Sequence, residues 1–237
     1  SPYDSGSYAS STAYLTGGAV VKTCDTLIGR ILEKGAEYLG VSADQVEFDG
    51  KRVYRLDGSG EISLKDIGNR AMCSNGYALE ATESNTSPVS PPPFMVGMAE
   101  VEVDLETGAV ELLDYAAVVD CGTPLNPNLT RIQTEGGLAQ GIGMALYEDV
   151  TYSPKGQVYE NSLMQYKIPT RQDVGTIRVE FESSYEKTGP FGAKSIGEVV
   201  INTPSPAIAS AVAHATGVYV RELPITAEKI YRGMTSR

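Results

Sequence analysis

One glycine-rich stretch of the chain reads Gly189-Pro190-Phe191-Gly192-Ala193-Lys194-Ser195-Ile196-Gly197-Glu198. It contains three glycines and one proline and ends on a single acid. Because glycine permits positive φ angles and close approach of the backbone, the stretch predicts a loop that lies against another part of the molecule or a ligand. Apolar Ile196 and Val199 flank the carboxylate, and apolar surroundings favour its protonated form. Glu198 is therefore a candidate base for proton transfer near neutral pH.

The same residues also fit a purely structural connector. An acid just before a helix is stabilised by the helix dipole, and Glu198 precedes the apolar run Val199–Ile201. A glycine-rich turn needs no ligand to explain it. The pattern alone leaves both interpretations open.

The composition is that of a globular protein and argues against two classes of partner. The chain has 237 residues, of which 41% are hydrophobic and 21% charged, enough for one or two domains. The net charge of -11 opposes binding to nucleic acid and to anionic membranes. No stretch approaches the about 20 apolar residues of a membrane span. The first residues, Ser1-Pro2-Tyr3-Asp4, do not show a signal-peptide pattern, so we expect a cytoplasmic protein.

Cysteines and histidines are few. Cys24, Cys73 and Cys121 form no CxxC pair, so the sequence indicates neither a zinc knuckle nor a disulfide framework, and reduced thiols fit an intracellular protein. The one histidine, His214, lies late in an apolar helical segment, where we expect a structural role rather than a catalytic one. A histidine-rich metal site is excluded.

Hydrophobic periodicity predicts an α+β protein with a sheet in each of two lobes. We expect helices near residues 19–39, 63–79, 129–147 and 204–216, and strands near 46–48, 52–54, 98–104, 110–119, 176–182 and 218–220. Residues 82–93 are rich in Ser, Thr, Asn and Pro, which predicts a loop and a candidate internal boundary.

The predicted helix near residues 129–147 contains four glycines: Gly136, Gly137, Gly141 and Gly143. Each is unfavourable in a helix by about 1 kcal/mol relative to alanine. Close packing against another backbone or a ligand would account for them. With Tyr8-Ala9-Ser10-Ser11 and Gly192–Glu198, this helix could line a polar, anionic ligand, although simple helix capping also explains the serines.

These segments also carry a family resemblance. Asp120–Pro127, Gly136–Gly143 and Gly192–Glu198 resemble the C-terminal molybdenum-cofactor (molybdopterin)-binding part of the xanthine dehydrogenase and aldehyde oxidase family. The resemblance covers nearly the whole chain. It implies a two-lobed α+β domain with mixed sheets and helices packed on them. Residues 1–237 would form the C-terminal portion of the molybdenum-cofactor-binding domain, with the internal boundary at about 82–93.

The resemblance also implies roles for individual residues. Glu198 would be the catalytic general base, which takes a proton from the hydroxide on molybdenum, and Gln140 would hydrogen-bond the metal's oxo ligand. No residue of the chain would bind the metal directly. The other expected cofactor-binding residues are Tyr8, Ala9, Ser10 and Ser11, near the pterin phosphate, and Lys194, Ser195, Ile196 and Gly197, beside the base.

The implied enzyme is an oxidoreductase that hydroxylates a heterocycle or an aldehyde with oxygen from water. Its cofactor would be molybdenum–molybdopterin, in a simple or a cytosine dinucleotide form. Clusters of the 2Fe-2S type and FAD would be held only by partner domains or subunits, since this chain lacks cysteine motifs and a dinucleotide fingerprint. An N-terminal molybdenum-binding portion would complete the site, so we expect the chain to be inactive alone, as a fragment or as one of two molybdenum subunits.

Two other classes of function stay open at this point. One is a non-catalytic α+β scaffold that binds a partner through the edge of the predicted hairpin. The other is a hydrolase that pairs Glu198 with Asp120, which requires two carboxylates within roughly 5–10 Å of each other.

Overall fold

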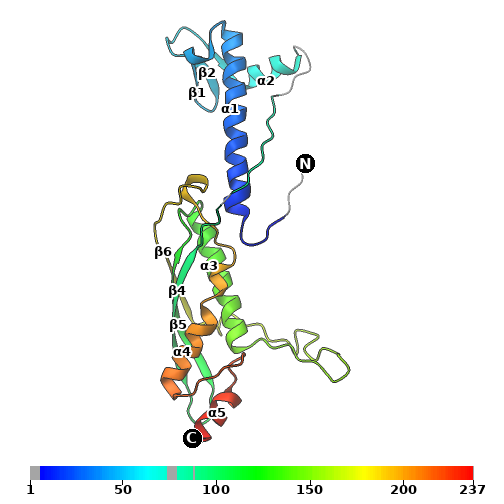
Figure 1. Cartoon of the computed structure of the whole chain (residues 1–237), viewed down its shortest axis with the longest axis vertical. Coiled ribbons are helices and arrows are strands. Elements are labelled where there is room, and N and C mark those ends of the chain that lie inside the picture. The colour runs from blue at the N-terminus through cyan, green and yellow to red at the C-terminus, as the bar shows by residue number, and fades with distance from the viewer. Residues whose placement is uncertain (1–5, 74–78, 88, 237) are drawn as a thin grey trace. The chain divides into compact units, whose positions relative to one another are not determined.

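The chain folds into two compact units, each with its own three-stranded sheet (Figure 1). The structure is a computed structural model and describes residues 6–73, 79–87 and 89–236. The smaller unit is Ala13–Pro88, and the larger unit combines Ser1–Thr12 with Val89–Arg237. The smaller unit is therefore an insertion into the larger one. The α+β class with two lobes is confirmed.

The smaller unit is a long helix packed on a short antiparallel sheet. Its elements are η1 (Thr12–Thr16), α1 (Gly17–Leu39), η2 (Ala43–Gln45), β1 (Val46–Phe48), β2 (Arg52–Arg55), β3 (Glu61–Ser63) and α2 (Leu64–Cys73). Helix α1 ends at Gly40, which has a φ of 67° and donates its N–H to carbonyls of the last turn. The core of this unit consists of Ile31, Ala36, Val46, Val53, Ile62 and Ile67.

Two boundaries in the smaller unit differ from the sequence prediction. Strand β3, at Glu61–Ser63, was not predicted, because three residues are too few to show a strand period. Helix α2 is described from Leu64 to Cys73; Leu79 is not helical, and residues 74–78 lie outside the described residues. Ser63 caps this helix, since its Oγ accepts the N–H of Asp66 at 3.1 Å.

The larger unit is a mixed sheet with helices on one face. Its elements are β4 (Phe94–Val103), β5 (Val110–Asp120), α3 (Pro127–Leu146), β6 (Thr176–Phe181), η3 (Pro190–Gly192), η4 (Val199–Ile201), α4 (Pro204–Thr216) and α5 (Ala227–Thr235). The central strand β5 pairs antiparallel with β4 and parallel with β6. Helix α4 packs on β4, and α3 packs on α4 and β6. These elements confirm the predicted hairpin, the strand near 176–182 and both helices.

The predicted strand at residues 218–220 is wrong. No strand forms there, and the chain instead ends in α5, with Thr226 as its cap. The apolar alternation has a different cause: Val218 is buried against Gly233 of α5, where an added Cβ would lie 2.4 Å from Val218 Cγ1. Helix packing thus produced a pattern that is typical of a strand.

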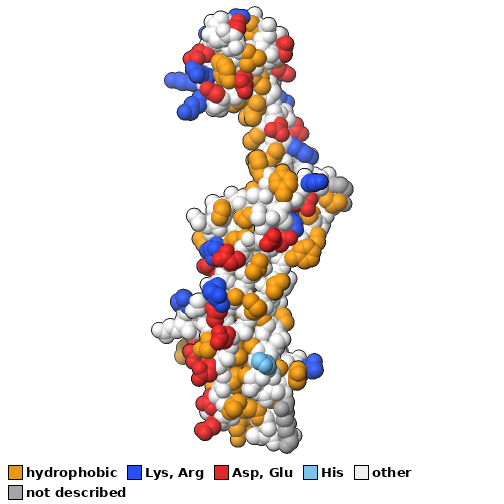
Figure 2. All heavy atoms as spheres, turned by 90° about the vertical axis from the view of Figure 1, so that its left-hand side faces the viewer, with side chains coloured by type: hydrophobic (Ala, Val, Ile, Leu, Met, Phe, Trp, Pro, Cys, Tyr) orange, Lys and Arg blue, Asp and Glu red, His pale blue; other side chains and the backbone are white. Residues whose placement is uncertain are grey.

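The surface shows no segregation of charge on the face displayed in Figure 2, where acidic, basic and hydrophobic side chains are mixed. Within the described residues, no helix combines the length and the apolar character that a bilayer crossing requires.

Candidate functional site

The glycine-rich loop is fixed to the end of β5 by backbone hydrogen bonds. The N–H of Thr123 donates to the carbonyl of Gly192, and the N–H of Lys194 donates to the carbonyl of Cys121, both at 2.8 Å. Gly192 has a φ of 86°, and a Cβ there would overlap the ring of Tyr185 at 2.3 Å. Glycine is therefore required at this position, and the loop has little freedom to move.

A half-buried ion pair between Lys194 and Asp120 also holds this loop in place. Lys194 Nζ lies 2.7 Å from Asp120 Oδ2, and the other oxygen, Oδ1, accepts hydrogen bonds from Ser184 and from the N–H of Gly122. Burial alone would raise the pKa of Asp120, but these donors, Lys194 first, outweigh it and keep that pKa below its usual range. The ammonium group of Lys194 is thus committed to Asp120, so contact of this side chain with a cofactor would have to compete with the ion pair.

One face of α3 points at the end of this loop. Gln133, Gly136, Gly137 and Gln140 are spaced three, four and seven residues apart from Gln133, which places them on one side of a helix. Gln133 Nε2 donates to the carbonyl of Gly197 at 2.8 Å. The carboxamide of Gln140 is exposed and makes no hydrogen bond with the described residues, so it is available to a ligand.

The glycines of α3 have two distinct surroundings. A Cβ at Gly137 would lie 2.2 Å from Val200 Cγ2, and one at Gly141 would lie 2.6 Å from Pro204 Cγ, so both positions require close packing. A Cβ at Gly136 would meet no described atom within 4 Å. The predicted close approach is confirmed at Gly137 and Gly141, while Gly136 leaves open space.

A tight turn near the N-terminus meets the loop from the opposite side. The N–H of Ser11 donates to the carbonyl of Tyr8 at 3.0 Å, and Ala9 and Ser10 both have left-handed backbones, with φ of 48° and 58°. Ser10 Oγ donates to Glu198 Oε2 at 3.0 Å. Residues that are 188 positions apart in sequence therefore meet at the predicted base.

Helix α3, the end of the glycine-rich loop and η4 form an open pocket of about 450 Å³. It is lined by Ile132, Gln133, Gly136, Gly137, Gln140, Gly197, Glu198, Val200, Ile201 and Asn202. Its polar groups are a carboxylate, three carboxamides and backbone. No Lys or Arg of the described residues forms an ion pair with Glu198, so the carboxylate is not neutralised within this chain.

The apolar environment expected around Glu198 is not found. Glu198 is exposed, and its carboxylate lies beside the Ser10 hydroxyl. Val200 is buried against Gly137, whereas Ile196 and Val199, which flank Glu198 in sequence, are only partly buried. Glu198 is the N-cap residue of η4, as the structural alternative requires, but its side chain makes no capping hydrogen bond there.

The predicted site residues fall into two groups. Gln140, Gly197 and Glu198 line the pocket, and Ser10 contacts Glu198. The remaining predicted residues lie on the adjoining turn or loop and are not among the lining residues: Tyr8, Ala9, Ser11, Lys194, Ser195 and Ile196. Their contact with a cofactor stays a prediction.

Two polar residues of this site were not predicted from the sequence. Gln133 is one of them, although its seven-residue spacing from Gln140 places both on one helix face. Asn202 lines the pocket beyond η4 and carried no sequence signal.

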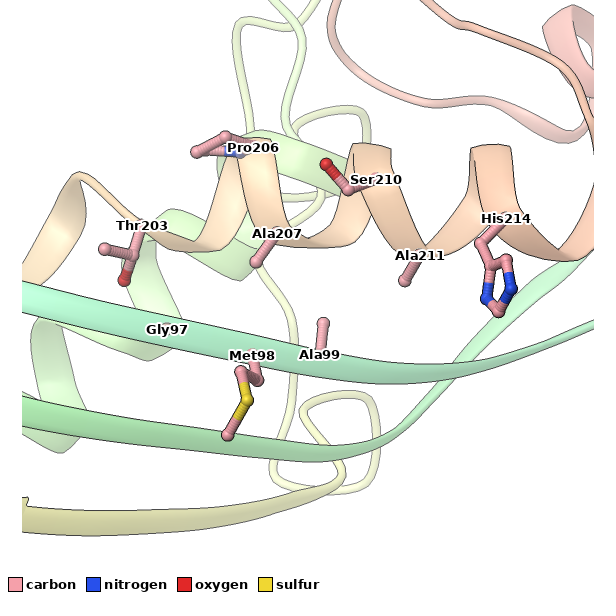
Figure 3. Close-up of a pocket in the computed structure, with 9 residues that line it drawn as sticks. All are labelled: Gly97, Met98, Ala99, Thr203, Pro206, Ala207, Ser210, Ala211 and His214. Atoms are coloured by element: carbon pink, nitrogen blue, oxygen red, sulfur yellow. The ribbon is translucent and has the colours of Figure 1, made fainter.

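A second groove, of about 490 Å³, lies between β4 and α4 and differs in chemistry (Figure 3). Thr203, Ala207, Ala211 and His214 project from α4 toward the strand, while Met98 points away from the helix. Gly97 permits close packing there, because Thr203 Oγ1 would lie 2.7 Å from a Cβ at that position. The groove contains neither carboxylate nor carboxamide, so the pocket around Glu198 is the better candidate for chemistry.

Among the described residues, no group of three or more His, Cys, Asp or Glu side chains is arranged to hold a metal ion. The three cysteines are free, Cys24 and Cys73 exposed and Cys121 buried. A metal at this pocket would therefore need ligands from outside the described side chains.

Comparison with protein families gives a match to the molybdopterin cofactor-binding domain over residues 1–175. The chain therefore belongs to this family, and its curated relatives include a putative xanthine dehydrogenase subunit, a carbon monoxide dehydrogenase large chain and an abscisic-aldehyde oxidase. The resemblance seen in the sequence is confirmed.

Individual relatives agree with this assignment. The chain is 36% identical to the probable hypoxanthine oxidase XdhD of Escherichia coli K12, over 96% of this chain and 24% of that protein. It is 32% identical to the gamma subunit of the 6-hydroxypseudooxynicotine dehydrogenase complex of Paenarthrobacter nicotinovorans, over 95% of this chain and 30% of that subunit. The chain thus spans about a quarter to a third of the length of such relatives.

A solved structure shows the same fold. The quinoline 2-oxidoreductase of Pseudomonas putida 86 superposes with a TM-score of 0.87 and 28% identity, over 99% of this chain and 31% of that one. The larger proteins therefore contain the two-unit fold described above as one part.

The pocket fits one side of a molybdopterin cofactor. Its donors are neutral amides, which can hydrogen-bond the polar edge of a pterin or an oxo group. Gly136 leaves space where any other residue would place a Cβ, and Glu198 is not paired with a cation. Gln140 and the left-handed turn at Ala9-Ser10 are the groups that would hold the cofactor here.

Proposed function

We propose that this chain is the C-terminal portion of the cofactor-binding domain of a molybdenum hydroxylase, with its internal boundary within residues 82–93. In this proposal Glu198 is the general base and Gln140 binds the cofactor. The substrate is a nitrogen heterocycle or an aldehyde, in keeping with the oxidases and dehydrogenases that the chain resembles.

The observation that supports the proposal is the shared position of Glu198 and Gln140 on one pocket. Ser10 occupies Glu198 Oε2, which leaves Oε1 without a partner among the described residues and able to accept a proton. A general base needs this combination of a fixed orientation and a free lone pair.

When bound, the molybdenum–pterin cofactor supplies the oxygen-transfer and redox chemistry. The chain's own residues orient the reacting groups and transfer protons. Gln140 offers both an N–H donor and a carbonyl acceptor from a rigid helix, and Glu198 takes up a proton at Oε1. Gly136 keeps the helix surface low enough for a ligand to approach the backbone.

The rest of the enzyme would come from other parts. An N-terminal molybdenum-binding portion would close the open side of the pocket, and iron–sulfur and FAD domains or subunits would carry electrons away. A hydrolase that pairs Glu198 with Asp120 is not favoured, because both oxygens of Asp120 are occupied by Lys194, Ser184 and the N–H of Gly122.

The proposal is tested by replacing Glu198 in the complete enzyme. Glu198→Gln preserves the shape of the side chain but not its basicity, so we expect kcat to fall by about 10²–10⁴-fold while the molybdenum content is unchanged. Glu102→Gln, at an exposed position on β4, serves as the control and should behave as the parent enzyme.

Turnover close to the parent value in Glu198→Gln would contradict the proposed base. The non-catalytic scaffold would gain support if the complete enzyme contained neither molybdenum nor hydroxylase activity. Elemental analysis of the chain alone adds a second test, since half a site should retain no stoichiometric molybdenum.

A further inference from the structure

The hydroxyl of Ser10 is placed on the carboxylate of Glu198 by a backbone that a serine rarely adopts. Ser10 has a φ of 58° and follows Ala9, at 48°. Glycine adopts such a conformation at lower cost, and strain of this kind persists only where the surrounding structure holds it. Glycine would offer no hydroxyl, however, and the hydroxyl is the group that reaches Glu198 Oε2 at 3.0 Å.

The loop on the other side is shaped to receive this contact. A Cβ at Gly197 would lie 2.9 Å from Ser10 Oγ, so the approach of the turn depends on a residue without a side chain. The carbonyl of Gly197 accepts the hydrogen bond from Gln133 Nε2 at 2.8 Å. The peptide that leads into Glu198 is therefore held from α3 while the carboxylate is held from the N-terminal turn.

We infer that Ser10 and Gln133 are positioning residues for Glu198. Ser10 fixes the carboxylate through Oε2 and directs Oε1 into the pocket, and Gln133 fixes the backbone from which the side chain extends. This inference rests on the proposed role of Glu198 as the base. Hydrogen bonds to a charged group are short and directional, which suits them to orient a carboxylate.

The inference gives Ser10 a function that differs from cofactor binding by its backbone. A backbone N–H would serve equally well in any residue that tolerates a left-handed conformation. The side-chain hydroxyl matters only if Ser10 acts through Glu198.

Four variants of the complete enzyme separate these roles. Ser10→Ala removes the hydroxyl and keeps Cβ, Ser10→Gly removes it and relieves the backbone strain, and Gln133→Ala frees the Gly197 carbonyl. Ser7→Ala is the matched control, because Ser7 lies in the same segment and its hydroxyl bonds Thr12 at 2.7 Å rather than Glu198.

We expect both Ser10 variants to lose about ten- to a hundredfold in kcat with KM changed by less than about twofold, since misplacement of a reacting group acts on turnover. Gln133→Ala should show the same trend more weakly. Ser7→Ala should retain the kcat and the KM of the parent.

Crystal structures of the cofactor-free variants provide a readout that does not depend on activity. The Glu198 carboxylate should move by about 1 Å or more in Ser10→Ala and remain in place in Ser7→Ala. Parent-like kcat in Ser10→Gly, or an unmoved Glu198 in Ser10→Ala, would overturn the inference. If Glu198→Gln is inactive in that case, the proposed base stands and only its positioning by Ser10 fails; an active Glu198→Gln removes the base itself.

Discussion

The two long helices of the molecule, α1 and α3, both contain glycines, but they use them differently. In α1, Gly35 lies against Val53, where an added Cβ would be 2.7 Å from the valine side chain. In α3, Gly137 lies against Val200 in the same manner, but Gly136 faces the open space of the pocket. Helix α1 thus uses Gly35 to pack on a sheet, whereas α3 packs through Gly137 and faces the open pocket at Gly136.

The comparison shows that a glycine in a helix has at least two structural causes. Gly29 of α1 and Gly136 of α3 share one property, since a Cβ added at either would meet no described atom within 4 Å. Only Gly136 lines the pocket with Glu198. Its function is therefore decided by what the helix faces and not by the helix itself.

The largest loss of activity is expected at Gly137, which packs against Val200 and also lines the pocket. Gly137→Leu would force a side chain into Val200 and displace η4, which directly follows Glu198. In the complete enzyme we expect kcat to fall by about 100-fold or more, since small displacements of a reacting group are costly. Steady-state kinetics of the folded fraction measure this. Parent-like kcat would show that the position of η4 does not matter to the site.

The difference between the two helices also depends on the stability of the glycine-rich loop that α3 contacts. This loop should be as stable as the sheet on which α1 packs. Lys194→Met tests this by leaving Asp120 without its cation, which we expect to cost about 1–3 kcal/mol of local stability. Because the native pKa of Asp120 is lowered, its contribution is present above the unfolded value of about 3.9 and is lost as the pH falls through the native pKa. The difference between variant and parent should therefore shrink below about pH 4.

Hydrogen exchange of amides in residues 192–198 measures this local stability. Arg178→Met, which breaks the exposed pair with Asp114 on the same sheet, is the control and should leave these amides unchanged. Equal protection in Lys194→Met and the parent would mean that the backbone bonds alone hold the loop.

A smaller, purely structural effect is expected in α1. Gly35→Ala should destabilise the smaller unit by about 1–2 kcal/mol, because overpacking against Val53 exceeds the gain in helix propensity. Hydrogen exchange in β2 reports the loss, and kcat of the complete enzyme should stay at the parent value. A fall in kcat without a loss of stability would break the distinction between the two helices.

The smallest changes in stability are expected at Gly136 and Gly29, and these two glycines can be compared directly. Gly136→Ala and Gly29→Ala should each stabilise their helices by up to about 1 kcal/mol through backbone entropy. Only Gly136→Ala should lower the molybdenum content of the complete enzyme, because only its methyl group enters the pocket. Thermal unfolding and elemental analysis measure the two quantities. Equal molybdenum content in both variants would assign Gly136 no role in access.

Helices and strands could be predicted from the sequence where they have a clear hydrophobic period or where proline or glycine marks their ends. Helix α4 was predicted with its observed bounds because prolines and Gly217 mark its two ends, and the hairpin β4–β5 showed a clear period of two. Helix α5 was missed, because its short amphipathic pattern follows the strand-like Val218-Tyr219-Val220. The contacts of the site could not be derived in this way, since Ser10, Gln133 and Glu198 are neighbours only in the folded chain. The family resemblance predicts Glu198 as the base, but it does not predict the contacts of Ser10 and Gln133 with residues 197–198.

The insertion of the smaller unit has a consequence for biosynthesis. Ser10 leaves the ribosome before Ala13–Pro88, and its partner Glu198 is made 188 residues later. The turn that carries Ser10 therefore has no contact with Glu198 while the smaller unit, with its own core, is translated and can fold. Closing so long a loop is slow and is possible only after β6 and the glycine-rich loop have emerged. Nascent chains truncated before Glu198 should therefore be unable to form the contact between Ser10 and Glu198.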